Sequence, residues 1–157
     1  PLPWQCSLPA ACELIASHEA DAHERAILDA CEAALAHADA ERSFVEHFWG
    51  AVPQRIKDGA VTRRAIGPEV ANRVGHVQGG ISFGIATKSA IAAAPAHMRL
   101  SGATAWYIGP GRGTTLVARS KLVHAGRTIA VVRTQLKNTR GERVLEVVTH
   151  HVARRDG

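Results

Sequence analysis

The chain has 157 residues, 46% of them hydrophobic, and a formal net charge of +5 at pH 7. This length allows one domain with a well-buried core plus an appendage, and it is short for two full domains. No segment reaches the ~18 uninterrupted apolar residues of a membrane-spanning helix, and no basic leader precedes an apolar signal core, so we expect a cytoplasmic protein with no membrane partner.

The N-terminal third is acidic and helical in pattern. Residues 1–52 hold nine acidic and two basic side chains. Within them, residues 10–37 are rich in Ala, lack Gly and Pro, and place Leu28, Cys31 and Leu35 at spacings of three and four. This pattern predicts one long helix over residues 10–37.

A second helix is predicted over residues 41–52, where Gly50 and the following Pro53 end the pattern. We expect residues 1–52 to form a helical extension that docks an apolar stripe on the rest of the chain. The three cysteines are odd in number and widely spaced, which indicates free thiols in a reducing compartment. They are Cys6, Cys12 and Cys31. Since the chain opens at Pro1, we expect a processed protein or a piece of a longer polypeptide.

The middle of the chain predicts a short strand over residues 60–66 and then a loop that carries Asn72. The glycine pair Gly79–Gly80 opens a helix of about fourteen residues that stops at Pro95. Apart from Lys88 this helix is apolar on nearly every side. We therefore expect it to be the buried central helix of the domain.

Beyond the central helix the apolar period changes from helical to alternating, which predicts strands. The four runs cover residues 100–108, 114–123, 128–137 and 143–152. The connections 124–127 and 138–141 each offer a glycine for a hairpin turn. We predict a four-strand meander in an α+β fold, with an antiparallel sheet wrapped around the central helix over residues 53–157. One helix does not cover a whole sheet face, so we expect pairing with a second copy or a second like domain.

The glycine pair also indicates a chemistry. Glycines at the start of a helix leave backbone N–H groups uncovered, and the helix dipole favours negative charge at that point. Gly79 and Gly80 therefore predict a site for an anion or an oxyanion. The rest of the chain after residue 52 holds 17 basic and 5 acidic side chains, and this excess suits a ligand that bears phosphate.

The motif resembles that of the hotdog-fold acyl-CoA thioesterases of the phenylacetate-pathway type. Their signature is an Asn, two residues, a Gly, two residues, and then His or Gln followed by two glycines. Here it consists of Asn72, Gly75, Gln78, Gly79 and Gly80. The segments 106–111 and 123–127 also resemble a strand and a hairpin of that family, and the likeness covers residues 53 to 153.

The resemblance implies a hydrolase of acyl-CoA thioesters whose sites lie at a homodimer, higher oligomer or pseudo-dimer interface. Coenzyme A enters only as part of the substrate, and no other cofactor is implied. The N–H of Gly79 or Gly80 polarises the thioester carbonyl, and Gln78 orients that carbonyl or a water. Asn72 belongs to the same signature. The family's catalytic acid stands seven residues after the second glycine, and this position is Thr87.

A threonine hydroxyl is not a base near neutral pH and needs a base beside it to become a nucleophile. Three explanations remain open. Thr87 holds a water while another group takes the proton, or a carboxylate such as Glu69 or Glu146 substitutes for the acid. Otherwise this copy is inactive, as one half of a tandem whose other half kept the acid.

Other side chains are candidates for supporting roles. His76, inside the motif loop, has a side-chain type whose pKa suits a general base. Among the basic residues, Arg127 in its turn, Arg112 and Lys137 are candidates to contact the phosphates of coenzyme A. No metal site is predicted, because His18, Glu19 and His23 miss the spacing of a zinc helix and because His150 and His151 point to opposite sides of one strand.

Two further classes compete with the hydrolase. The alternative that Thr87 supports is a catalytically inactive domain that binds acyl-CoA or serves dimerisation. Nucleic-acid binding is not expected, because the basic part offers only three aromatic residues, Phe83, Trp106 and Tyr107, for stacking bases. A dehydratase of the same fold is disfavoured, because no acidic residue lies between Glu69 and Glu142.

Overall fold

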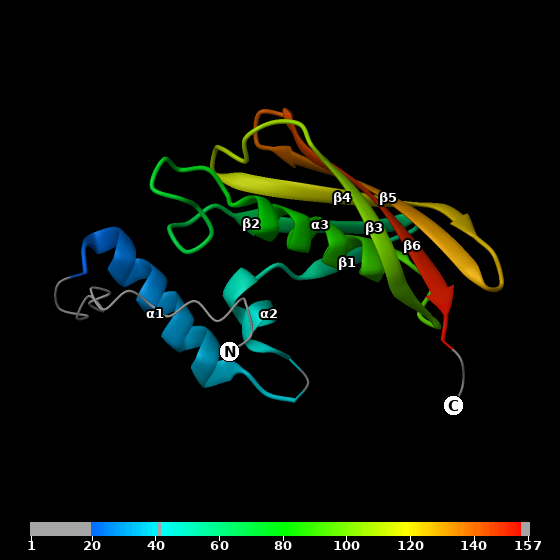
Figure 1. Cartoon of the computed structure of the whole chain (residues 1–157), viewed down its shortest axis with the longest axis horizontal. Helices are drawn as coiled ribbons and strands as arrows, with labels where there is room; N and C mark the ends of the chain where they lie inside the picture. The colour runs from blue at the N-terminus through cyan, green and yellow to red at the C-terminus, as the bar shows by residue number, and fades with distance from the viewer. Residues whose placement is uncertain (1–19, 41, 155–157) are drawn as a thin grey trace, which may run out of the picture.

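The computed structural model describes residues 20–40 and 42–154. In these residues a six-stranded antiparallel sheet curves around one long helix, α3, and two further helices lie on the side of α3 away from the sheet (Figure 1). The helices are α1 (Ala22–His37), α2 (Phe44–Trp49) and α3 (Gly79–Ala93). The strands are β1 (Pro53–Ile56), β2 (Gly59–Ala65), β3 (Met98–Tyr107), β4 (Thr115–Ala125), β5 (Ile129–Asn138) and β6 (Arg143–Ala153).

The strand order across the sheet is β1-β2-β4-β5-β6-β3. Both predicted hairpins are present, because β4 pairs with β5 and β5 with β6. The predicted four-strand meander is wrong, since β3 pairs with β6 and forms the far edge of the sheet. Alternation along a strand specifies which face is buried and says nothing of which strand lies beside it. The predicted strand at 60–66 is confirmed as β2, one residue earlier.

The strand β1 was not predicted. It has only four residues, three of which are exposed, and it begins at Pro53, a residue that fits an edge strand. It forms a hairpin with β2 in which Ile56 lies opposite Gly59. The predicted domain boundary after residue 52 coincides with the start of β1, and the division of the chain into two units stays a prediction.

The first helix begins later than predicted. The carboxylate of Asp21 accepts the backbone N–H of Glu24 at 2.9 Å, and the carboxylate of Glu24 accepts that of Asp21 at 2.9 Å. This reciprocal cap fixes the helix start at Ala22, so the prediction of one helix over 10–37 is wrong at residues 20–21, and its earlier part lies outside the described residues. The free thiol of Cys31 lies on α1.

The second helix is shorter than the predicted range 41–52. Ser43 and Glu46 form a capping box at its start, and Gly50 ends it in the left-handed region at a φ of 56°. The six residues between these caps make less than two turns. Within the described ranges, no helix is long and apolar enough to cross a membrane.

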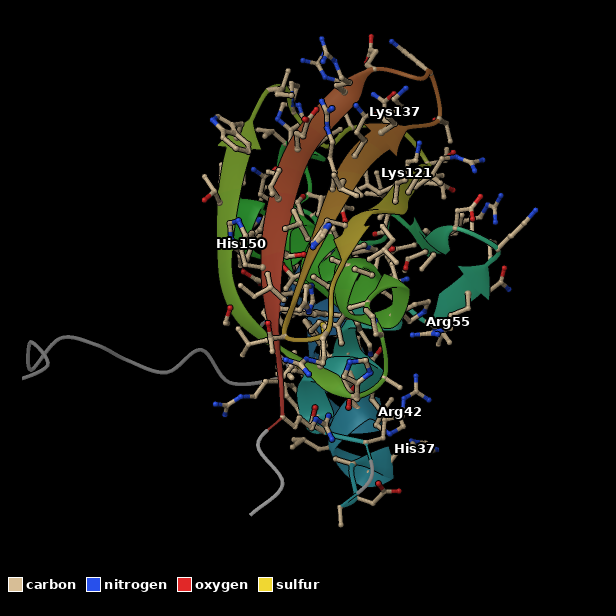
Figure 2. The ribbon with its side chains drawn as sticks, turned by 90° about the vertical axis from the view of Figure 1, so that its right-hand side faces the viewer. His37, Arg42, Arg55, Lys121, Lys137 and His150 are labelled. Carbon is tan, nitrogen blue, oxygen red and sulfur yellow. The ribbon has the colours of Figure 1, made fainter. Side chains whose placement is uncertain are left out.

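The core lies between α3 and the concave face of the sheet. Ile85, Ala86 and Ala90 of α3 are fully buried, as are Leu116 of β4 and Leu136 of β5. The predicted central helix is therefore confirmed in position and in burial on its sheet side, while its N-terminus and Ile91 are exposed. Figure 2 shows the sheet curling around α3, with His37 and Arg42 on the side of α3 opposite Lys121 and Lys137.

Three hydroxyl groups form a polar link through this core. The Ser120 hydroxyl of β4 lies 2.9 Å from that of Ser89 on α3 and 2.7 Å from that of Thr134 on β5. All three residues are buried. Since buried polar groups need partners, this chain of hydrogen bonds fixes the register of α3 against the sheet.

Candidate active site

The loop before α3 is held by Asn72. The side-chain oxygen of Asn72 accepts the backbone N–H of Val74 at 3.2 Å and that of His76 at 2.9 Å. The backbone N–H of Asn72 donates to the His76 carbonyl at 2.8 Å. Gly75 completes the turn at a φ of 75°, which an L side chain rarely adopts. The side-chain oxygen of Asn72 thus stabilises the loop. It is bonded within the loop and not to the glycine pair.

Val77 and Gln78 connect this loop to the sheet and to α3. The N–H of Val77 donates to the Gly111 carbonyl at 2.8 Å, and the N–H of Gln78 donates to the Val70 carbonyl at 3.2 Å. Gln78 is the N-cap of α3, with an exposed side chain that makes no capping hydrogen bond. The backbone of Gln78 is therefore fixed while its side-chain amide stays available to a ligand.

The first amides of α3 are uncovered. The first N–H of the helix with an acceptor is that of Ser82, which donates to the Gln78 carbonyl at 3.0 Å. Among the described residues, no acceptor meets the N–H groups of Gly79, Gly80 and Ile81. Both glycines are exposed. The start of α3 thus presents unpaired donors, backed by the positive end of the helix dipole, to whatever lies in front of it.

Tyr107 lies over Gly79, a contact that the sequence analysis missed. Its hydroxyl donates to the Gly79 carbonyl at 3.2 Å, and a Cβ on Gly79 would lie 3.2 Å from the Tyr107 ring. A Cβ on Gly80 would meet nothing within 4 Å. The sequence gives no signal for this contact, because it arises from the pairing of Tyr107 with Leu145 across β3 and β6. Tyr107 thus covers one side of the helix start and leaves Gly80 open.

Thr87 lies on α3, two turns after the glycine pair. It is 9% exposed, and its hydroxyl donates to the Phe83 carbonyl at 2.8 Å. Such a bond back to the preceding turn is common for threonine in helices. The hydroxyl proton is therefore engaged, and only its lone pairs remain to hold a water.

The carboxylates named as substitutes for the missing acid lie elsewhere. Glu146 is on the face of the sheet away from α3, where it accepts a hydrogen bond from Arg133 at 2.7 Å. Glu69 forms an ion pair with Arg64, and both side chains are largely buried. Neither carboxylate faces the start of α3 within one chain, and both are already paired.

The three basic candidates fall into two groups. Arg112 is exposed next to Gly111, whose carbonyl accepts the N–H of Val77 immediately before Gln78, and Lys137 lies on the outer face of β5 at the same end of the sheet. Arg127 is in the β4–β5 turn, near the C-terminal end of α3. One chain therefore brings Arg112 close to the glycine pair and keeps Arg127 away from it.

No cluster of three or more metal-ligating side chains occurs in residues 20–40 and 42–154, and His18 and Glu19 lie outside them. His150 is exposed and His151 is fully buried, so the predicted opposition of the two rings is confirmed. The His151 ring lies 2.9 Å from the Thr149 hydroxyl. Burial, together with the nearby His150, lowers the pKa of His151, which keeps this ring neutral.

Gly79 and Gly80 stand on an open surface. Five hollows of the described surface, with volumes of about 260 to 660 Å³, are lined by other residues. A closed site over the glycine pair therefore requires a second surface. The strand edge next to it carries exposed apolar side chains in sequence, at Trp106, Tyr107 and Ile108.

Comparison with solved structures identifies the architecture. The BH2602 protein from Bacillus halodurans, solved with CoA, has a TM-score of 0.72 and 23% sequence identity over 88% of this chain and 97% of that chain. The PaaI protein from the phenylacetic acid degradation operon of E. coli has a TM-score of 0.63 and 18% identity over 83% and 95%. Thioesterase HI1161 from Haemophilus influenzae has a TM-score of 0.62 and 16% identity over 70% and 81%.

The chain has the hotdog fold. The predicted fold class is thus confirmed, including a helical N-terminal extension. No protein-family model matches the sequence, and neither does any curated protein. The similarity to the solved hotdog proteins lies in the course of the backbone, so the chemistry of this hotdog domain has to be argued from its own residues.

Proposed function

We propose that this hotdog domain is an acyl-CoA thioesterase, which hydrolyses an acyl-CoA thioester to a free acid and coenzyme A. The observation that carries the proposal is the set of unpaired amides at Gly79, Gly80 and Ile81, at the start of α3. Similar solved structures support it, because several are named thioesterases and two contain CoA.

The reaction uses these amides to stabilise charge. The thioester oxygen accepts N–H bonds from Gly79 and Gly80, and it becomes negative when water adds to the carbonyl carbon. Preorganised donors of this kind contribute about 3 to 4 kcal/mol to the transition state. The side chain of Gln78 orients the carbonyl or the attacking water. When the tetrahedral intermediate collapses, the carbon–sulfur bond breaks, and the departing CoA sulfur takes up the proton that the general base removed from the water.

The proton of the attacking water goes to a base other than Thr87. We assign this role to His76, because histidine is the commonest general base in enzymes and because His76 lies two residues before Gln78 in the loop held by Asn72. Thr87 holds the water through the lone pairs of its hydroxyl, because its proton is donated to the Phe83 carbonyl. In this assignment Asn72 is a positioning residue.

A second copy of the chain completes the site. The edge strand β3 offers unpaired backbone groups beside exposed Trp106 and Tyr107, and such edges pair readily with another strand. Pairing of β3 with its copy covers the exposed Gly80. Arg112 and Lys137 contact the phosphates of coenzyme A, whereas Arg127 contacts those of a substrate held by another copy.

A catalytically inactive domain that binds acyl-CoA or serves dimerisation is the second candidate. It is favoured by one observation, the hydroxyl of Thr87 engaged with Phe83 where the resemblance implies a free carboxylate. In this case the glycine amides bind the thioester oxygen without turnover.

Two measurements separate the candidates. Purified protein is incubated with a panel of acyl-CoA substrates from acetyl to decanoyl, and release of free thiol is followed. Calorimetry measures the binding of a non-hydrolysable acyl-CoA analogue. Turnover of any member of the panel supports the hydrolase, and binding without turnover supports the inactive domain. Absence of both thiol release and analogue binding contradicts both candidates.

A further inference from the structure

The N-terminal extension places an aromatic ring directly on α3. Trp49, the last residue of α2, lies so close to Gly84 that a Cβ on this glycine would lie 2.1 Å from the indole ring. Only a residue without a side chain allows this approach. Trp49 and Gly84 are thus fitted to one another.

The position of α2 is fixed by a second contact. The carboxylate of Glu46 lies 3.0 Å from the ammonium of Lys88, one turn along α3 from Gly84. The hydrogen bond from Lys88, together with those from Ser43, lowers the pKa of Glu46, so the Glu46 carboxyl is ionised at neutral pH. Trp49 and Glu46 therefore hold α2 across the face of α3 that points away from the sheet, where Figure 1 shows it.

This arrangement places Trp49 close to the amides of the proposed site. Gly84 lies four residues after Gly80, which corresponds to about 6 Å along the helix axis and about 40° around it. An acyl group whose carbonyl oxygen binds the N–H of Gly80 and whose chain runs along this face of α3 meets the indole after a few carbons. Trp49 is partly exposed, so one part of its ring is available as a wall.

We propose that Trp49 is a specificity-determining residue that restricts the acyl group to a short chain of a few carbons. This inference rests on the proposed thioesterase function, because it needs the thioester at Gly79 and Gly80. It assigns a role to the N-terminal extension, which positions the Trp49 ring, and to Gly84, whose lack of a side chain makes room for that ring. The substrate class is then short-chain acyl-CoA.

The test compares chain-length profiles of the parent and of Trp49→Ala. In the parent we expect kcat/KM to peak at butyryl- or hexanoyl-CoA and to fall at octanoyl-CoA. In Trp49→Ala the chain can bury further methylenes, each worth about fourfold, so octanoyl-CoA, with two more methylenes, becomes about 16-fold better than hexanoyl-CoA. Trp49→Phe, which keeps a ring, is expected to give an intermediate profile.

Two matched variants separate the wall from the docking of α2. Gly84→Ala moves the indole by steric conflict, so its profile is expected to extend as well. Lys88→Gln removes the ion pair with Glu46 but leaves Trp49 against Gly84, so its profile is expected to stay that of the parent. Thermal unfolding of each variant shows whether the fold is kept.

The outcomes distinguish this inference from the function on which it rests. If the parent hydrolyses acyl-CoA and Trp49→Ala keeps the parent's chain-length profile, Trp49 does not determine specificity, while the proposed thioesterase function is supported. If no variant hydrolyses any thioester, the thioesterase fails, and the Kd values of butyryl and octanoyl analogues then test the wall. Equal ratios of these two Kd values in the parent and in Trp49→Ala overturn it.

Discussion

Replacing Gly79 by proline removes one proposed catalytic N–H with little cost to the fold. Gly79 is the first residue of α3, and proline is favoured at this position because its missing N–H has no helical partner. Gln78 already has the extended conformation, with a φ of −62° and a ψ of 143°, that a residue before proline adopts. The free energy of unfolding is therefore expected to stay within about 1 kcal/mol of the parent.

The expected effect on catalysis is much larger. Loss of one oxyanion donor costs about 3 to 4 kcal/mol, so kcat for a good acyl-CoA substrate is expected to fall by about 10² to 10³. The matched control is Gly79→Ala, which places the same Cβ 3.2 Å from the Tyr107 ring but keeps the N–H. Gly80→Ala, which meets nothing within 4 Å, controls for helix propensity.

Steady-state kinetics measure kcat of the three variants, and urea denaturation measures their free energies of unfolding. Gly79→Pro is expected to lose activity while it stays folded, and Gly79→Ala is expected to lose less than tenfold. If Gly79→Pro is folded and as active as Gly79→Ala, the N–H of Gly79 does not stabilise the transition state. If both lose activity equally, the contact with Tyr107 is responsible instead.

Three further predictions concern other parts of the chain. Because His76 is assigned as the base, Thr87→Asp is expected to leave kcat within about tenfold of the parent, and a gain of about 10² or more that Thr87→Asn does not share would contradict that assignment. Thr104→Lys, on the exposed edge strand β3, is expected to lower the mass measured by light scattering from dimer to monomer; an unchanged mass places the interface elsewhere. The lowered pKa of His151 means that the unfolded chain binds more protons, so the free energy of unfolding is expected to fall as pH drops below ~6.5. His151→Asn is expected to weaken this dependence in urea titrations at pH 5 and pH 7, and an unchanged slope contradicts the assignment.

The central helix and the hairpins could be predicted because their signals are local. The glycine pair and Pro95 bound α3, and glycine turns with alternating runs define β4, β5 and β6. The partner of β3 could not be predicted, since pairing with β6 depends on contacts between distant residues and not on the pattern within either strand. The short edge strand β1 was missed for a related reason, because three of its four residues are exposed and give no alternation.

The candidate site could be predicted only where it is made of backbone. The amides of Gly79 and Gly80 follow from their place at a helix start, which sequence specifies. Tyr107 and Trp49 approach α3 from distant segments, so no spacing in the sequence reveals them. A glycine inside a helix was the one available sign of Trp49, since Gly84 lowers helix propensity and a close packing contact is a common reason for its presence.

NMR can observe directly whether the amides at the start of α3 bind the thioester. The backbone amide resonances of Gly79 and Gly80 are followed by NMR while a non-hydrolysable acyl-CoA analogue is added. These two N–H signals are expected to shift downfield and to be among the largest changes in the chain, because they donate to the thioester oxygen. If the analogue binds and shifts other amides while Gly79 and Gly80 stay unchanged, the thioester does not bind at the start of α3.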